Sequence, residues 1–402
     1  MDYNQNNQYG AYPQGYMPPQ NQGNYNSYNP YSGNYDGSRQ NMNGYYQPPV
    51  YNNMPYGNAP VYPYGIRNNQ QNYEMVQQRF IRLREQKQEI KKYSSAIAGA
   101  MIAFLVISSI FGIVLELLNL TSLYESNTTF SSCIGVFYSF TSIGIPFMLA
   151  KRVMAGAKED HTVSYYAPKF NLKTVSVILA SVLGCLAAMC FTGFITYFFE
   201  EMGITFSSGK EPEINSVYDI IALFLGTAIV PPLVEEFAMR NVVMQPLRKY
   251  GNAFAVIMSA VVFGVFHGTP SQIPFAMLCG LFIGYAVIAT NSIWSGVIIH
   301  AIVNALSCAY YTFLYFTDED TADSMYEAVC MVVAAAGLVG LIVYLIKFRD
   351  EVKSILSENG LAEYTLKEKV IKFIFTPAMI IAIIIFMIQA ISLISFNSGV
   401  YA

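Results

Sequence analysis

Six side chains that could transfer protons or donate hydrogen bonds lie within one apolar stretch of the chain. They are two carboxylates, a guanidinium, two imidazoles and an amide, at Glu235, Glu236, Arg240, His267, His300 and Asn304. A charged group in a membrane span costs about 3 kcal/mol, so ionisable residues kept there indicate function. A lone histidine on an apolar helix is more often a satisfied core residue, but this combination favours a site that moves protons near neutral pH.

The spacing of the first three residues predicts different environments for the two carboxylates. Arg240 lies four residues after Glu236 and five after Glu235. Residues four apart are neighbours on a helix, whereas successive residues point about 100° apart. We therefore expect Arg240 to pair with Glu236 and to leave Glu235 available for chemistry.

The polar residues are also expected at a similar depth in the membrane. With a rise of about 1.5 Å per residue, Glu235 lies about 20 Å from the basic end of its apolar run. His267 lies about 22 Å from Asn252, where the next apolar run begins. His300 and Asn304 lie about 12 to 20 Å from Asn291-Ser292, at the start of their own run. Side chains from three helices can therefore converge on one buried polar cavity.

The composition is that of an integral membrane protein. Of 402 residues, 53% are apolar and 12% charged, with a mean hydropathy of +0.34. The net charge is only -3 and no basic block argues for a nucleic-acid partner. Six cysteines lie at or within apolar runs without a paired CxxC spacing, which favours buried thiols over disulfides or metal ligands.

Apolar runs long enough to cross a bilayer predict an all-α, polytopic transmembrane helical bundle of about eight or nine spans. We place them near residues 95–118, 131–150, 174–198, 217–249, 253–270, 272–290, 293–316, 327–347 and 371–395. The fourth run is too long for one straight crossing and contains Pro231-Pro232. We expect a kink or break there, with a separate helix in its second half.

The chain divides into five parts by composition. Residues 1–73 are rich in Asn, Gln, Tyr, Pro and Gly and predict a disordered tail, and residues 74–94 predict a basic juxtamembrane helix on anionic headgroups, with a short coiled-coil helix as the alternative. The rest comprises amino-terminal membrane helices over 95–200, the polar-bearing core over 217–308 and carboxyl-terminal membrane helices over 327–396. The first span follows about ninety polar residues, which indicates an internal signal-anchor.

Basic residues alternate between successive loops. Lys and Arg precede the first run and recur after the second run, at Arg248-Lys249 and after Phe348, whereas the intervening loops are mainly acidic. By the positive-inside rule, the amino terminus is cytoplasmic and the carboxyl terminus lies outside.

The polar motifs resemble those of the CPBP intramembrane proteases, which include the type II CAAX prenyl endopeptidases and the Abi bacteriocin-immunity proteins. The matching segments are Glu-Glu-Phe-Ala-Met-Arg over 235–240, Phe-Gly-Val-Phe-His over 263–267 and His-Ala-Ile-Val-Asn over 300–304. The turn at 290–294 is also similar, and the resemblance covers about residues 217–308. The family usually has glycine after the motif arginine, whereas this chain has Asn241, which puts the packing after Arg240 in question.

The resemblance implies a glutamate-type endopeptidase without a cofactor. Glu235 and His267 would hold and deprotonate a water that attacks a peptide carbonyl, and His300 with Asn304 would donate hydrogen bonds to the oxyanion. Arg240 would keep Glu236 ionised, and Phe263 would pack in the cavity wall. We expect a multi-pass protein of a bacterial cell membrane, in contact with membrane lipids and acting on prenylated or bacteriocin-like protein or peptide substrates.

Three alternatives remain open at this point. Glu235, His267 and His300 could be a zinc ligand set with one open position, although no HExxH spacing supports it. The same residues could hold helices together in a non-catalytic scaffold or immunity protein. A transporter with proton-relaying carboxylates is the third alternative, weakened by the absence of an evident inverted repeat.

Overall fold

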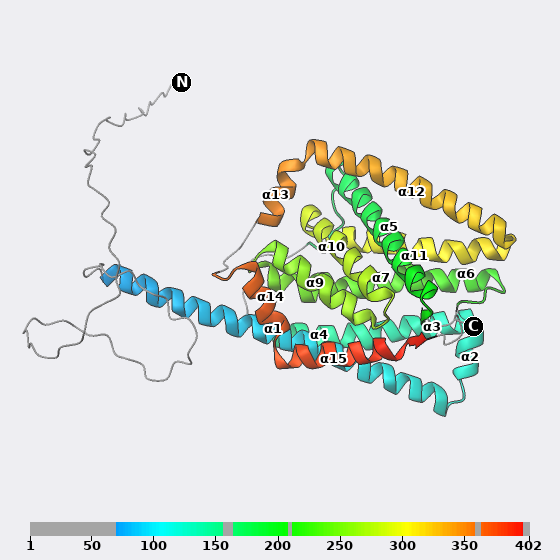
Figure 1. The fold of residues 1–402 in the computed structure, drawn as a ribbon, viewed down its shortest axis with the longest axis horizontal. Helices are drawn as coiled ribbons and strands as arrows, with labels where there is room; N and C mark the ends of the chain where they lie inside the picture. The colour runs from blue at the N-terminus through cyan, green and yellow to red at the C-terminus, as the bar shows by residue number, and fades with distance from the viewer. Residues whose placement is uncertain (1–69, 156–163, 208–210, 358–362, 397–402) are drawn as a thin grey trace, which may run out of the picture. The chain divides into compact units, whose positions relative to one another are not determined.

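The computed structural model describes residues 70–155, 164–207, 211–357 and 363–396. The predicted tail up to residue 69 lies outside these ranges. Within the described ranges the protein is a helical bundle (Figure 1). The predicted all-α polytopic architecture is confirmed.

The amino-terminal half contributes four long helical stretches. Their elements are α1 (Gln70–Leu117), α2 (Thr121–Ser126), α3 (Thr128–Tyr138), η1 (Ser139–Gly144), α4 (Ile145–Met154), α5 (Leu172–Glu201), α6 (Val217–Leu223), η2 (Phe224–Ile229), α7 (Val230–Glu236), η3 (Phe237–Met244) and α8 (Gln245–Arg248). The η elements are π-helical turns that continue the helices around them.

The carboxyl-terminal half adds seven helices and a small sheet. The helices are α9 (Asn252–His267), α10 (Gln272–Thr290), α11 (Ile293–Phe316), α12 (Glu319–Lys347), α13 (Arg349–Ser357), α14 (Leu366–Ile374) and α15 (Pro377–Ser392). Strands β1 (Ile204–Phe206) and β2 (Ile394–Phe396) pair antiparallel, with Thr205 opposite Ser395. This pair joins the end of α5 to the end of α15.

Seven helices of the described part are long and apolar enough to cross a membrane, or eight if the bent pair α14 and α15 is one span. Every predicted apolar run is helical, but α9, the counterpart of run 253–270, has only 16 residues. A straight span needs about 20 residues, so α9 does not reach that length by itself.

The fourth run is not divided at its two prolines. Residues Val217–Arg248 stay one helix of 32 residues. Pro231 and Pro232 occupy the start of α7, directly after the π-helical turn η2. Because a proline lacks the N–H that a helix needs, the helix widens locally rather than ending, and such π turns are frequent at functional sites. The expected separate second helix is therefore not formed.

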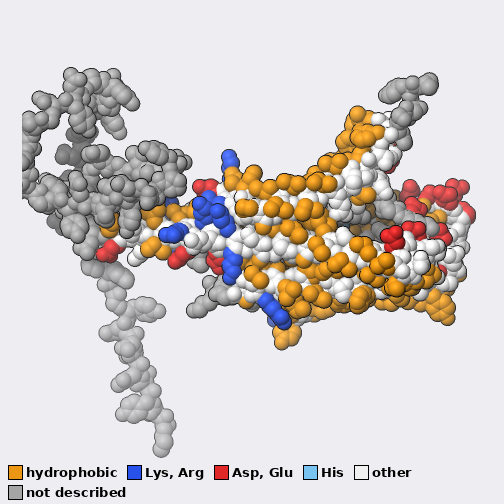
Figure 2. Space-filling view, turned by 90° about the horizontal axis from the view of Figure 1, so that it is seen from below, with side chains coloured by type: hydrophobic (Ala, Val, Ile, Leu, Met, Phe, Trp, Pro, Cys, Tyr) orange, Lys and Arg blue, Asp and Glu red, His pale blue; other side chains and the backbone are white. Residues whose placement is uncertain are grey.

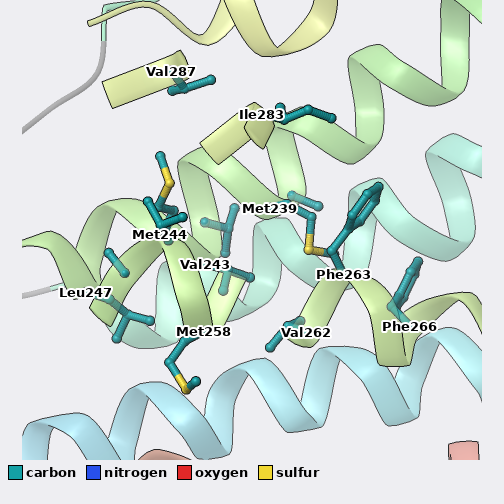
Figure 3. Close-up of a cluster of buried hydrophobic side chains, with 14 of the residues drawn as sticks. Met239, Val243, Met244, Leu247, Met258, Val262, Phe263, Phe266, Ile283 and Val287 are labelled. Carbon is teal, nitrogen blue, oxygen red and sulfur yellow. The ribbon is translucent and has the colours of Figure 1, made fainter. Parts of the chain in front are cut away.

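The core of the bundle lies around α9. Figure 3 shows side chains of η3 and α8 packed against α9 and α10, among them Met239, Val243, Met244, Leu247, Met258, Val262, Phe263, Phe266, Ile283 and Val287. Glycines allow the close approach of α9 to α10: a Cβ on Gly280 would lie 2.9 Å from the Ala260 Cα atom. This packing holds together η3 and α9, two of the helical elements that carry predicted polar residues.

The surface separates apolar from charged side chains. Figure 2 shows a broad hydrophobic belt, with Lys and Arg side chains toward one end and a group of Asp and Glu side chains at the other. The outward faces of α1, α5, α12 and α15 carry exposed large hydrophobic residues, for example Ile113, Phe194, Val339 and Ile388. Such a belt matches the hydrocarbon core of a bilayer.

Candidate active site

The buried pair of the site is Glu236 with Arg240, as the helical spacing predicts. The Arg240 Nε atom lies 2.9 Å from the Glu236 Oε2 atom, and neither side chain is exposed. Arg240 also donates from Nη1 to the hydroxyl oxygen of Ser259 at 2.8 Å, and its guanidinium carbon lies 5.4 Å from the centre of the Phe263 ring. The pair thus joins η3 to α9 as well as neutralising a buried carboxylate.

Glu235 occupies a different environment from its neighbour. Its side chain is 15% exposed, and it lies on another face of the same helix turn. The closest charged or polar contact recorded for it in the described part of the chain is His300 Nε2, 3.8 Å from its Oε2 atom. Glu235 is therefore the carboxylate of the pair that Arg240 leaves available.

His300 lies between the two carboxylates. Its Nδ1 atom is 3.1 Å from the Glu236 Oε1 atom, and its Nε2 atom faces Glu235. Since Glu236 is itself held by Arg240, the imidazole ring is oriented by a group that cannot move freely. This arrangement couples α11 to α7 through three charged or titratable groups.

His267 lies at the carboxyl-terminal end of α9. Its Nδ1 atom is 2.8 Å from the carbonyl oxygen of Phe263. A carbonyl only accepts, so Nδ1 carries the proton, and in the neutral ring Nε2 is then the basic nitrogen. The Phe263 ring lies edge-on to both imidazoles, with centres 4.7 Å from His267 and 5.6 Å from His300. Phe263 thus separates the two histidines as a wall residue.

Asn304 binds backbone rather than another predicted site residue. Its Nδ2 atom donates to the carbonyl oxygen of Thr227 in η2 at 3.0 Å. In the helix that carbonyl would accept from residue 231 or 232, and both are prolines without an N–H. Asn304 therefore satisfies a carbonyl that Pro231-Pro232 leave without a helical donor.

Two further residues shape the site and were not predicted. A Cβ on Gly296 would lie 2.6 Å from the Glu236 Oε2 atom, so only glycine lets α11 approach the buried carboxylate. Ser259 accepts from Arg240 and donates to the Met239 carbonyl at 3.0 Å. A sequence signal existed for Gly296 alone, because it lies four residues before His300 on the same helix face.

Asn241 replaces the glycine that the resembled family usually has at this position. It is buried, and its Oδ1 atom accepts from Lys151 Nζ of α4 at 3.0 Å. The substitution therefore adds a link between η3 and α4, and leaves the Glu236 to Arg240 pair intact.

The zinc alternative does not fit the side chains as they lie. In the described part of the chain, no three His, Cys, Asp or Glu residues are placed so that they could hold a metal ion. Both His300 nitrogens face carboxylates, and no hydrogen bond or ion pair joins His267 to Glu235 among the described residues. We therefore derive no step through a metal.

Comparison with known proteins gives one match. Residues 218–306 match the family model described as type II CAAX prenyl endopeptidase Rce1-like. No curated protein and no solved structure matches the chain. The matched segment contains all six predicted polar residues and runs from α6 into α11. Residues 218–306 are thus similar to the type II CAAX prenyl endopeptidases, and they lie in a multi-pass membrane protein.

Proposed function

We propose that the protein is an intramembrane endopeptidase that hydrolyses membrane-proximal peptide bonds with a water activated by Glu235. The observation that carries this proposal is the division of labour between the two carboxylates. Arg240 and His300 both contact the fully buried Glu236, whereas Glu235 is partly exposed and has no contact with Arg240 among the ion pairs of the described residues. A general base needs this combination of proximity to polar groups and access to a water.

His267 supports the base. The hydrogen bond from Nδ1 to the Phe263 carbonyl fixes the ring and its tautomer, so that Nε2 presents a lone pair. A water held between this nitrogen and Glu235 would lose its proton to the carboxylate as it attacks the substrate carbonyl. No cofactor is required by this step.

His300 and Asn304 are proposed to stabilise the oxyanion that this attack creates. The Asn304 amide uses one of its two N–H groups for Thr227 and retains the second. A protonated His300 can donate from Nε2 while its Nδ1–H faces Glu236. Donors fixed in this way need no reorganisation during the reaction, which is what makes an oxyanion site effective.

The substrate proposed is a protein or peptide held at the membrane, of the prenylated or bacteriocin-like classes. A site buried in a helical bundle receives such a substrate from the bilayer or its surface. The gathering of Lys and Arg at one end of the belt in Figure 2 supports a cytoplasmic amino terminus by the positive-inside rule. The membrane proposed is a bacterial cell membrane.

Cleavage of a membrane-tethered peptide by purified protein in nanodiscs tests the proposal. Glu235→Gln should abolish cleavage and leave thermal unfolding unchanged, because the amide fills the same volume but takes no proton. Glu327→Gln is the matched control, since that carboxylate lies in α12 at the start of another span. If the Glu235→Gln variant cleaves the peptide as fast as wild type, Glu235 is not the general base. If folded wild type cleaves no tethered peptide, the protein is instead a non-catalytic scaffold or immunity protein.

A further inference from the structure

A second group of charged residues lies far along the chain from the site, where α14 packs against α1. The segment before α14 docks on α1 through three contacts: Tyr364 donates to the Leu83 carbonyl at 2.9 Å, Glu363 N–H donates to Gln86 at 3.1 Å, and Glu363 accepts from Arg82 at 2.9 Å. These contacts bring lysines from two distant parts of the sequence onto one surface. Figure 1 shows α14 lying against α1.

Three of these lysines lie near one another where α14 packs against α1. Lys87 and Lys91 lie one turn apart on α1, and their charges repel Lys372 of α14, which Glu368 attracts. Lys372 Nζ lies 4.0 Å from the centre of the Tyr364 ring. We call Lys87, Lys91 and Lys372 the basic cluster. Like charges brought together destabilise a fold unless an anion lies among them.

Two of the three nearby carboxylates are engaged elsewhere. Glu363 pairs with Arg79 and Arg82, and Glu89 contacts Lys249, Tyr93 and Tyr250. Glu368, the acidic residue one turn before Lys372, accepts from the Thr365 backbone N–H at 2.8 Å in a capping box and also attracts Lys372. One carboxylate offsets at most one of the three lysine charges. In the part of the chain that the structure describes, no ion pair joins a carboxylate to any lysine of the basic cluster.

A buried lysine adds to the positive potential behind the cluster. Lys369 is 3% exposed, and its Nζ atom donates to the Tyr250 carbonyl at 2.5 Å. A carbonyl satisfies the hydrogen bond but does not neutralise the charge. The end of the bundle where α1 meets α14 is therefore positive and under-neutralised.

The position of the cluster indicates what kind of anion it meets. Helix α14 is bent by 72° from the apolar α15, so it turns away from the direction of a span. Exposed apolar side chains lie on either side of Lys372, with Ile371 at 43% exposure and Phe375, directly after α14, at 66%. Figure 2 shows basic side chains at the edge of the hydrophobic belt, the depth of lipid headgroups.

We propose that the basic cluster binds the phosphate of an anionic glycerophospholipid, whose acyl chains lie along Ile371 and Phe375. The lipid would neutralise the three ammonium groups and hold α14 against α1. A free phosphate offers the same charge but would leave the adjacent apolar side chains uncovered. The lipid therefore matches both the basic cluster and the apolar side chains beside it.

Native mass spectrometry of the purified full chain, released from phosphatidylcholine nanodiscs doped with phosphatidylglycerol, tests this proposal. Wild type should retain phosphatidylglycerol, and Lys87→Gln/Lys91→Gln/Lys372→Gln should retain it about tenfold less strongly or worse. The control Lys169→Gln/Lys347→Gln/Lys353→Gln removes the same charge from exposed lysines outside the cluster and should behave as wild type. Replacing the cluster by three arginines should preserve retention, because the charge is kept.

Three results would overturn the proposal. Equal retention by wild type and the cluster variant shows that these lysines do not bind the lipid, and equal loss in the control variant shows a general charge effect. Complete displacement of phosphatidylglycerol by millimolar inorganic phosphate shows that the cluster recognises phosphate without the lipid. Should the glutamine variant fail to fold, loss of retention in the folded Lys372→Gln single variant, with recovery in Lys372→Arg, decides the matter.

Discussion

The side-chain amide of Asn304 donates to the carbonyl oxygen of Thr227 at 3.0 Å, across the gap between α11 and η2. That carbonyl has no donor along its own helix, because Pro231 and Pro232 follow four and five residues later. The contact holds η2, about two helical turns before Glu235 and Glu236. The amide therefore acts on the backbone, and in the proposed mechanism its second N–H would act on the substrate.

A variant series separates these two roles of Asn304. Asn304→Ala should lower turnover about a hundredfold or more, the usual loss for one oxyanion donor, and should also lower stability by about 1 kcal/mol through the orphaned Thr227 carbonyl. Adding Pro231→Ala and Pro232→Ala restores backbone donors, so we expect stability to recover and turnover to stay low. Turnover that recovers together with stability would show that Asn304 only positions the helix.

The buried ion pair predicts unequal effects of the two neighbouring glutamates on stability. Glu236→Gln leaves the Arg240 guanidinium buried without its charge partner, and Arg240→Ala strands the Glu236 carboxylate. Breaking a buried pair costs about 3 to 5 kcal/mol, so both variants should unfold at clearly lower temperature. Glu235→Gln, with a partly exposed side chain, should unfold like wild type. A Glu236→Gln protein as stable as wild type would contradict a structural role for the pair.

Gly296 provides a test of how His300 is held. A methyl group there would meet the Glu236 Oε2 atom and the Val287 side chain, at 2.6 and 2.8 Å. We expect Gly296→Ala to cost about 1 to 3 kcal/mol by overpacking and to reduce kcat more than it raises KM, because the displaced carboxylate moves His300. Gly193→Ala is the control, since a Cβ there has nothing within 4 Å. Unchanged kcat in Gly296→Ala would show that the contact does not control the site.

Local spacing predicted the part of the site that lies on one helix. The four-residue separation of Glu236 and Arg240 was enough to predict their ion pair, and the turn of the helix was enough to separate Glu235 from it. The similar membrane depth of the polar residues predicted that the helices now seen as α7, α9 and α11 bring them together. These features depend on helix geometry alone, which a periodic apolar sequence specifies well.

Contacts between helices were less predictable. The pairing of His300 with Glu236 depends on how α11 is rotated and how closely it approaches, which Gly296 decides. The prolines predicted a break, but π-helical widening kept one helix because Asn304, 77 residues away, satisfies the freed carbonyl. Span counting included run 253–270 as a crossing, whereas its helix α9 has only 16 residues, because composition does not report where a helix ends.

The arrangement of the two histidines and Glu235 predicts that cleavage does not depend on zinc. His300 faces Glu236 and Glu235 through its two nitrogens, and His267 uses Nδ1 for a backbone carbonyl, so the three proposed zinc ligands are not gathered around one point. A zinc site would have required about 2 Å from each ligand to the metal. We therefore expect cleavage of the tethered peptide to survive prolonged dialysis against a strong chelator, and added zinc to leave it unchanged. Zinc content measured on the dialysed protein controls for incomplete removal of the metal. As a further control, a Lys151→Gln variant changes a contact of Asn241 but none of the three proposed ligands. Its cleavage activity should also survive dialysis against the chelator. Cleavage that disappears with the metal and returns with zinc would show that Glu235, His267 and His300 rearrange around an ion, and Glu235 would then be a ligand rather than the general base.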